Sequence, residues 1–133
     1  MICRMELVER LPTVDEFVEL LRRVGWPLPP GDVCERALGG SLAAICALDG
    51  GELVGMGRLV GDGGMYCFAV DVVVDPGAQR TGIGRALMDR LHGLAAERRL
   101  AMRLDLVAAP DVVPFYQRLG YSKLESHLMR KTL

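Results

Sequence analysis

The chain has 133 residues, half of them hydrophobic, and its formal net charge is −1 at pH 7. This length suits one core, so we expect a single domain over residues 1–133. The near-neutral charge argues against nucleic acid as a partner, and no apolar run has the length of a membrane-spanning helix. Because residues 1–6 hold no apolar stretch of signal-peptide length, we expect a cytoplasmic protein that acts away from membranes.

The N-terminal part of the sequence predicts a strand followed by a helix. Residues 3–9 alternate loosely between apolar and polar side chains, as strands do. Thr13 and Glu16 have the spacing of a capping box, an apolar stripe follows at helical spacing, and a glycine ends it. These signals predict a helix over 14–24 that stops at Gly25.

The middle of the chain predicts a short helix and three strands. A proline-rich turn leads into the helix at 32–39. Strands at 41–48 and 53–60 are joined by Asp-Gly-Gly-Glu, which is a hairpin signature. A glycine-rich turn then leads into a third strand at 65–74. Short connections of this kind predict three consecutive antiparallel strands.

A long amphipathic helix is predicted over 82–98, with leucines on one face. The strand expected at 100–107 should lie parallel to the strand at 65–74, because a helical crossover connects them. Two polar residues within these elements are expected to face solvent. They are Arg58, in the strand at 53–60, for which a substrate role is the alternative, and His92, on the polar face of the helix.

The C-terminal part predicts a short helix and two short strands. Asp111 can cap the helix, a proline is tolerated in its first turn, and Gly120 ends it. Strands are expected at 121–124 and 127–132. The four cysteines are widely spaced and form no Cys-x-x-Cys pair, so neither a metal site nor disulfides are expected. They are Cys3, Cys34, Cys46 and Cys67.

The strongest functional signal lies at 68–87, where an apolar strand runs through a glycine loop into the long helix. The free N–H groups and the dipole at a helix N-terminus favour a phosphate. Gly82 and Gly84 allow a ligand to approach the backbone closely. Arg80 and Arg85 add positive charge and forked donors. The sequence therefore predicts a phosphate-binding loop.

Two other phosphate loops do not fit this stretch. A Walker loop needs Lys-Ser or Lys-Thr after its last glycine, where this chain has Arg85 and Ala86. A Rossmann fingerprint needs a third glycine three residues after Gly84, where Leu87 stands. A glycine-rich helix entry with a purely structural role is the alternative.

A family resemblance resolves the choice of ligand. The pattern Gln-x-x-Gly-x-Gly at 79–84, preceded by Val-x-Val-Asp-Pro at 72–76, resembles the acetyl-CoA loop of the GCN5-related N-acetyltransferases, the GNAT superfamily. The segment Phe-Tyr-Gln-Arg-Leu-Gly-Tyr at 115–121 resembles the second signature of that family. The resemblance extends over essentially the whole chain. It implies an α/β GNAT fold, with a mixed, twisted sheet of about six to seven strands and helices on both faces.

The resemblance also implies an activity. Acetyl-CoA would be the cosubstrate, and its acetyl group would pass by direct attack to a primary amine of a small molecule or a peptide, without a metal. Dimers are common in the family, so a homodimer is one expected state. Two alternatives stay open: a catalytically weak CoA-binding sensor or regulatory module, and a protein-interaction domain with a degenerate loop. The sequence does not identify the acceptor, since one fold serves many substrates.

By the same resemblance, the strand polarises the thioester carbonyl through its main-chain N–H groups and the loop holds the diphosphate. The expected cofactor-binding residues are Val72, Val73, Val74, Gln79, Arg80, Thr81, Gly82, Ile83, Gly84 and Arg85. Many relatives carry Asn in the loop before the last helix, whereas residues 108–111 here are Ala-Ala-Pro-Asp. Trp26 would floor the acceptor pocket, or else anchor the core.

Two side chains are candidates for proton transfer. Tyr116 would protonate the leaving thiolate, because a thiol pKa of about 8.5 and a phenol pKa of about 10 allow easy exchange; the alternative is aromatic packing. An alkyl amine arrives protonated, and Asp71, a charge inside an apolar strand, is the candidate base. Its alternative is a structural carboxylate paired with an arginine or with backbone. Some relatives carry the acid at the position of Val70, and Asp105 is the reserve.

Overall fold

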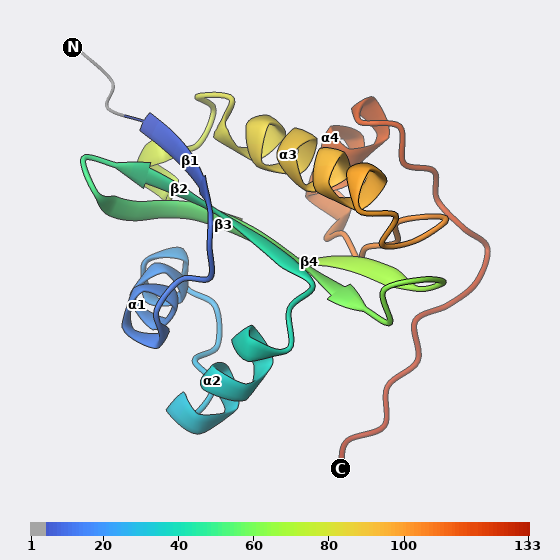
Figure 1. The fold of residues 1–133 in the computed structure, drawn as a ribbon, viewed down its shortest axis with the longest axis horizontal. Helices are drawn as coiled ribbons and strands as arrows, with labels where there is room; N and C mark the ends of the chain where they lie inside the picture. Colours follow the sequence, from blue (N-terminus) through green and yellow to red (C-terminus); the bar gives the residue numbers. More distant parts are fainter. Residues whose placement is uncertain (1–4) are drawn as a thin grey trace.

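The computed structural model describes residues 5–133 (Figure 1). The strands are β1 (Met5–Glu9), β2 (Ala43–Asp49), β3 (Glu52–Gly61) and β4 (Cys67–Val74). The helices are α1 (Val14–Val24), α2 (Gly31–Gly39), α3 (Ile83–Glu97) and α4 (Val113–Arg118), and 3₁₀ turns lie at Pro76–Ala78 and Pro110–Val112. None of these helices is long and apolar enough to cross a membrane.

The four strands form one antiparallel sheet in the order β1-β2-β3-β4. Helices α1 and α2 cover one face of the sheet, and α3 and α4 cover the other (Figure 1). Each face has its own core. Leu87 and Leu91 of α3 pack with Ile45 on one side, and Leu20 of α1 packs with Met56 on the other. The predicted helices on both faces are therefore confirmed.

Local signals account for the elements that the sequence predicts correctly. The N–H of Glu16 donates to Thr13 Oγ1, and the N–H of Thr13 donates to the Glu16 carboxylate, so α1 begins with a complete capping box. Gly25 ends α1 in the left-handed conformation, with φ of 84°. Gly50 and Gly51 make the turn between β2 and β3. The three consecutive antiparallel strands, now β2 to β4, are confirmed.

A bulge interrupts β4 beside β3. Val70 lies opposite Arg58 and Val73 opposite Met56, so two residues of β4 occupy the space facing a single residue of β3. Asp71 is one of these two residues. Its φ of 50° lies in the left-handed region that residues other than glycine rarely adopt. A bulge bends its strand and disrupts the regular ladder. Beyond the bulge, the edge of β4 that faces away from β3 is not paired with another strand of the described residues.

The predicted strand at 100–107 is wrong, although its direction is right. One isolated parallel bridge joins Phe68 to Asp105. Asp105 N–H donates to the carbonyl of Cys67, and Ala69 N–H donates to the carbonyl of Asp105, each at 3.0 Å. No ladder continues from this bridge, because the bulge turns the end of β4 away from its neighbour.

The predicted strands at 121–124 and 127–132 are also wrong, since residues 121–133 form no ladder. An alternating pattern forms a strand only where a partner can pair with it. Here Leu128 and Met129 stay exposed. The expected mixed sheet of six to seven strands is thus four antiparallel strands within residues 5–133.

Candidate active site

A cavity of about 620 Å³ opens where the end of β4 separates from residues 106–109. The predicted site residues that line it are Trp26, Asp71, Val72, Val73, Val74, Gln79, Gly84 and Tyr116. Trp26 follows α1 and Gly84 belongs to α3, and these two helices lie on opposite faces of the sheet (Figure 1). The cavity therefore passes the edge of the sheet from one face to the other.

The bulge reverses the hydrogen-bonding direction of β4. Before the bulge, Ala69 N–H points away from β3 and donates to the carbonyl of Asp105. Regular alternation would turn the N–H of Asp75 the same way, because the two residues are an even number of positions apart. Asp75 N–H instead donates to the carbonyl of Val54 in β3, at 2.7 Å. The extra residue of the bulge has inverted the alternation.

This inversion decides which N–H groups of β4 face the cavity. Val73, buried opposite Met56, directs its N–H toward β3. Val72 and Val74 direct theirs toward the open edge, where the cavity lies. These two donors come from the three valines that the sequence predicts for the thioester carbonyl. Their side chains need no polar group, because the main chain supplies the contact.

The loop between β4 and α3 is held by its own side chains. Gln79 Nε2 donates to the carbonyl of Val74 at 3.0 Å, and Thr81 Oγ1 donates to the carbonyl of Ala78 at 2.5 Å. Gly82 occupies the N-cap of α3 with φ of 85°, a conformation that favours glycine. No side chain caps α3. The N–H groups of its first turn are therefore free to bind an anion.

Positive charge flanks these free N–H groups. Arg80 and Arg85 are both exposed in the loop and the first turn of α3. The Nε atom of Arg85 lies 3.8 Å from a carboxylate oxygen of Asp89, an exposed pair that holds the arginine only weakly. Ile83 differs from its neighbours, since its side chain is buried in the core. Only its main chain can contribute to binding.

Tyr116 of α4 stands beside the cavity. Its ring packs edge-on against Phe115 and Tyr121, with centroids 5.0 and 5.9 Å away. Burial raises the pKa of the Tyr116 phenol above its ordinary value. The phenol therefore carries its proton at neutral pH, which is the state a proton donor needs. The packing alternative and the donor role are compatible, because the ring packs and the residue still lines the cavity.

Asp71 is ion-paired. Its Oδ2 accepts a hydrogen bond from Arg58 Nε at 2.7 Å. Arg58 Nη1 also donates to the carbonyl of Ala37, at 3.1 Å, and to Ser41 Oγ, at 3.2 Å. The prediction that Arg58 projects into solvent is wrong, since its side chain is only 12% exposed. Asp71 is therefore paired with an arginine, as expected for a structural carboxylate. It also lines the cavity, as a base would have to.

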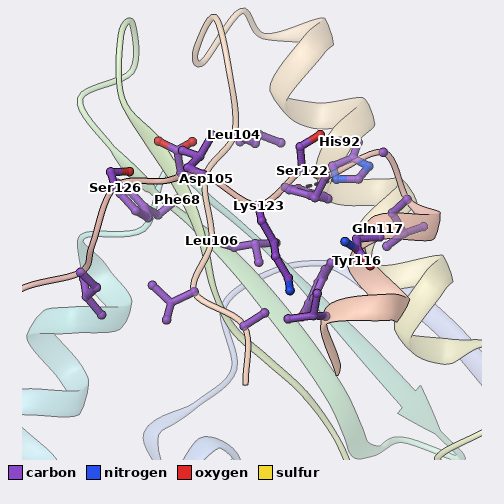
Figure 2. Close-up of a pocket in the computed structure, with 18 of the residues that line it drawn as sticks. Phe68, His92, Leu104, Asp105, Leu106, Tyr116, Gln117, Ser122, Lys123 and Ser126 are labelled. Atoms are coloured by element: carbon purple, nitrogen blue, oxygen red, sulfur yellow. Dashed lines mark hydrogen bonds between the residues drawn. The ribbon is translucent and has the colours of Figure 1, made fainter. Parts of the chain in front are cut away.

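A second cavity, of about 780 Å³, lies on the other side of Tyr116, beneath the C-terminal segment (Figure 2). His92 lines it, with Nε2 2.7 Å from the hydroxyl of Tyr121. The prediction that His92 lies in solvent is therefore wrong, and desolvation lowers its pKa. Asp105, the reserve base, lines this second cavity and not the first.

Sequence reasoning misplaced two residues near the first cavity, Arg58 and Asp111. Arg58 and Asp71 are lone charges in the interiors of neighbouring apolar strands, and this coincidence could have suggested their pairing. Asp111 was expected to cap a helix. It lies instead in the 3₁₀ turn and lines the cavity, while α4 begins after Val112 without a side-chain cap.

Comparison with known proteins identifies the family. The family model described as an acetyltransferase (GNAT) domain matches residues 41–123, which is more than half of the chain. The chain belongs to the GNAT acetyltransferases. Both signatures found in the sequence, at 72–84 and 115–121, lie within the matched range.

Relatives and solved structures agree with this assignment. Serotonin N-acetyltransferase 2, chloroplastic, from Oryza sativa subsp. japonica is 35% identical over 108 residues, which cover 78% of this chain and 54% of the rice protein. The chain thus spans about half the length of that relative. A GNAT-family acetyltransferase from Streptococcus pneumoniae is 30% identical, with a TM-score of 0.82 over 97% of this chain and 98% of its own.

A third likeness shows the fold alone. An aminoglycoside N-acetyltransferase solved in complex with CoA has a TM-score of 0.77 at 16% identity, covering 99% of this chain and 97% of its own.

Proposed function

We propose that this GNAT protein transfers an acetyl group from acetyl-CoA to a primary amine. The observation that carries the proposal is the cavity that joins Trp26, the inverted end of β4 and the first turn of α3. A thioester lying along β4 would meet an amine arriving from the α1 face and would keep its diphosphate on the α3 face. The CoA complex of the aminoglycoside N-acetyltransferase, which shares the fold, supports this choice of cosubstrate.

The residues present suit two parts of acetyl-CoA, its diphosphate and its thioester. The uncapped N–H groups of α3, Arg80 and Arg85 suit the diphosphate. The N–H groups of Val72 and Val74 suit the thioester carbonyl, and as donors fixed in a strand they would stabilise the oxyanion that forms on attack. Gln79 supports this arrangement by its hydrogen bond to the carbonyl of Val74.

The reaction needs one proton removed and one supplied. The amine nitrogen bonds to the carbonyl carbon, and the carbon–sulfur bond then breaks with its electron pair left on sulfur. Tyr116 is the proposed donor of the proton to that thiolate. Asp71 is the proposed acceptor of the amine proton through Oδ1, since Oδ2 is bound to Arg58. Water or Asp105 are the alternatives to Asp71, and Asp105 is the weaker one because it lines the other cavity.

Trp26 is proposed to form a wall at the acceptor end of the cavity. Its side chain is 41% exposed and lines the cavity, which suits an apolar wall for an amine substrate better than a core anchor. The rice relative is named a serotonin N-acetyltransferase, and a soybean relative is named a histone acetyltransferase. These two names cover a small amine and a protein, so both kinds of acceptor belong in the test.

The decisive experiment is a turnover screen. The protein and acetyl-CoA are mixed with a panel of small amines, amino acids and peptides, and free thiol release is followed with product detection by mass spectrometry. Product formed with one amine class supports the proposal, and that acceptor's KM should rise in Trp26→Ala. Tight acetyl-CoA binding by calorimetry without any product would favour a CoA sensor. Absence of both binding and product would favour an interaction domain.

A further inference from the structure

We infer that Arg58 is a positioning residue for acetyl transfer, which it serves by holding the bulge of β4 in place through Asp71. The inference rests on the proposed function, because the bulge matters to catalysis only if Val72 and Val74 polarise a thioester. Arg58 itself is not among the residues lining the cavity. It acts through Asp71 and not on substrate.

The bulge is a strained feature that needs support. Asp71 has φ of 50°, a conformation that costs a side-chain-bearing residue free energy and persists only where its surroundings enforce it. Its carboxylate accepts a hydrogen bond from Arg58, with Oδ2 2.7 Å from Nε. The ion pair with Arg58 therefore holds Asp71, the strained residue itself, and not a neighbour on the same strand.

Arg58 is fixed at three points from separate elements. Besides Asp71 in β4, it contacts the carbonyl of Ala37 near the end of α2 and the hydroxyl of Ser41 in the loop before β2. Its own backbone belongs to β3, opposite Val70. A planar guanidinium with forked donors can satisfy such a set, whereas a lysine ammonium cannot reproduce its geometry. With 12% of its side chain exposed, Arg58 is largely withdrawn from solvent and links α2 to the bulge.

The direction of two main-chain N–H donors depends on these contacts of Arg58. Val72 N–H and Val74 N–H point to the cavity only because the extra residue at Asp71 inverts the alternation of β4. An oxyanion donor is effective when it is held in place before the reaction. Misplacement of a catalytic group by about 1 Å costs on the order of a hundredfold in rate. A loosened bulge should therefore slow acetyl transfer while leaving the diphosphate site intact.

The test compares Arg58→Met and Arg58→Lys with a matched control, Arg10→Met. Arg10 makes a two-point ion pair with Glu16, at 2.9 and 3.0 Å, and neither residue lines the cavity. For Arg58→Met we expect kcat to fall by about tenfold to a hundredfold, with acetyl-CoA KM and CoA affinity nearly unchanged. Arg58→Lys should recover only part of the rate. Arg10→Met should lower the melting temperature and keep the wild-type kcat.

Hydrogen exchange supplies a readout independent of turnover. The amides of Val70 and Val73 face β3 on either side of the bulge, and they should exchange faster in Arg58→Met than in wild type or Arg10→Met. Wild-type kcat together with wild-type exchange in folded Arg58→Met would overturn the inference, as would a fall in kcat equal to that of Arg10→Met. A wild-type protein that acetylates no amine would contradict the proposed function and the catalytic part of this inference. The exchange comparison would then still decide whether Arg58 holds the bulge.

Discussion

The hydroxyl of Tyr121 lies 2.7 Å from Nε2 of His92, so a single hydrogen bond joins the segment that follows α4 to the middle of α3. Their rings are 5.5 Å apart. Desolvation lowers the pKa of His92 below its ordinary value of about 6.5. The unfolded chain therefore binds this proton at a higher pH than the folded chain does.

The sign of the resulting pH dependence follows. Stability contributed by neutral His92 is complete above about pH 6.5 and is lost as the pH falls toward the folded-state pKa. We expect wild-type melting temperature to drop between about pH 7.5 and pH 5.5 by more than that of His92→Gln, which cannot titrate. Glu16, whose pKa of about 2 reflects its pairing with Arg10, contributes only at lower pH. Equal drops in the two proteins would contradict the prediction.

Tyr116→Phe removes only the proposed proton donor. General acid catalysis contributes roughly a hundredfold to ten-thousandfold, so turnover should fall by about that factor while acetyl-CoA affinity stays nearly constant. Tyr121→Phe is the matched control, because it loses a hydroxyl bound to His92 in the other cavity and should reduce stability without slowing turnover. Steady-state kinetics and calorimetry measure both effects. A Tyr116→Phe protein with wild-type turnover would mean that the thiolate takes its proton elsewhere.

Gly84→Val tests the phosphate site. A Cβ at this position would lie 3.5 Å from the Phe115 ring, which is ordinary contact, so the fold should survive while the added methyl groups crowd the cavity. Loss of one or two charge-assisted hydrogen bonds to the diphosphate should weaken acetyl-CoA binding by about tenfold to a hundredfold. Gly93→Val, on the same helix with open space around it, is the control and should bind normally. Unchanged affinity in folded Gly84→Val would refute the site.

Asp71→Asn separates a base from a purely structural carboxylate. As a base, Asp71 must be ionised, so the variant should lose activity at neutral pH and recover part of it at high pH, where the amine is already neutral. As a structural partner of Arg58 only, the residue should instead lower the melting temperature and reduce kcat by a similar factor at every pH, with no recovery at high pH. Both quantities are measured on the same variant. A lowered melting temperature with an unaltered pH–rate profile would show that Asp71 is not the base and that water accepts the amine proton.

The sequence predicted the elements whose signals are local. The capping box at Thr13 and Glu16 and the glycine at Gly25 define α1 by contacts within a few residues. The loop around Gly82 was recognisable because a free helix N-terminus and a left-handed glycine leave their own pattern. The family followed from this loop and its preceding strand together with the second signature at 115–121, each of which is a local pattern. None of these depends on a distant part of the chain.

Tertiary structure decided what depends on pairing between distant segments. The stretch at 100–107 has the composition of a strand, yet it meets β4 at one bridge only, because the bulge at Asp71 bends its partner. The same bulge, and not the valine composition, selects Val72 and Val74 as outward donors. Arg58 is largely withdrawn from solvent because Asp71, Ala37 and Ser41 contact it from three separate elements, an arrangement that no local sequence pattern encodes.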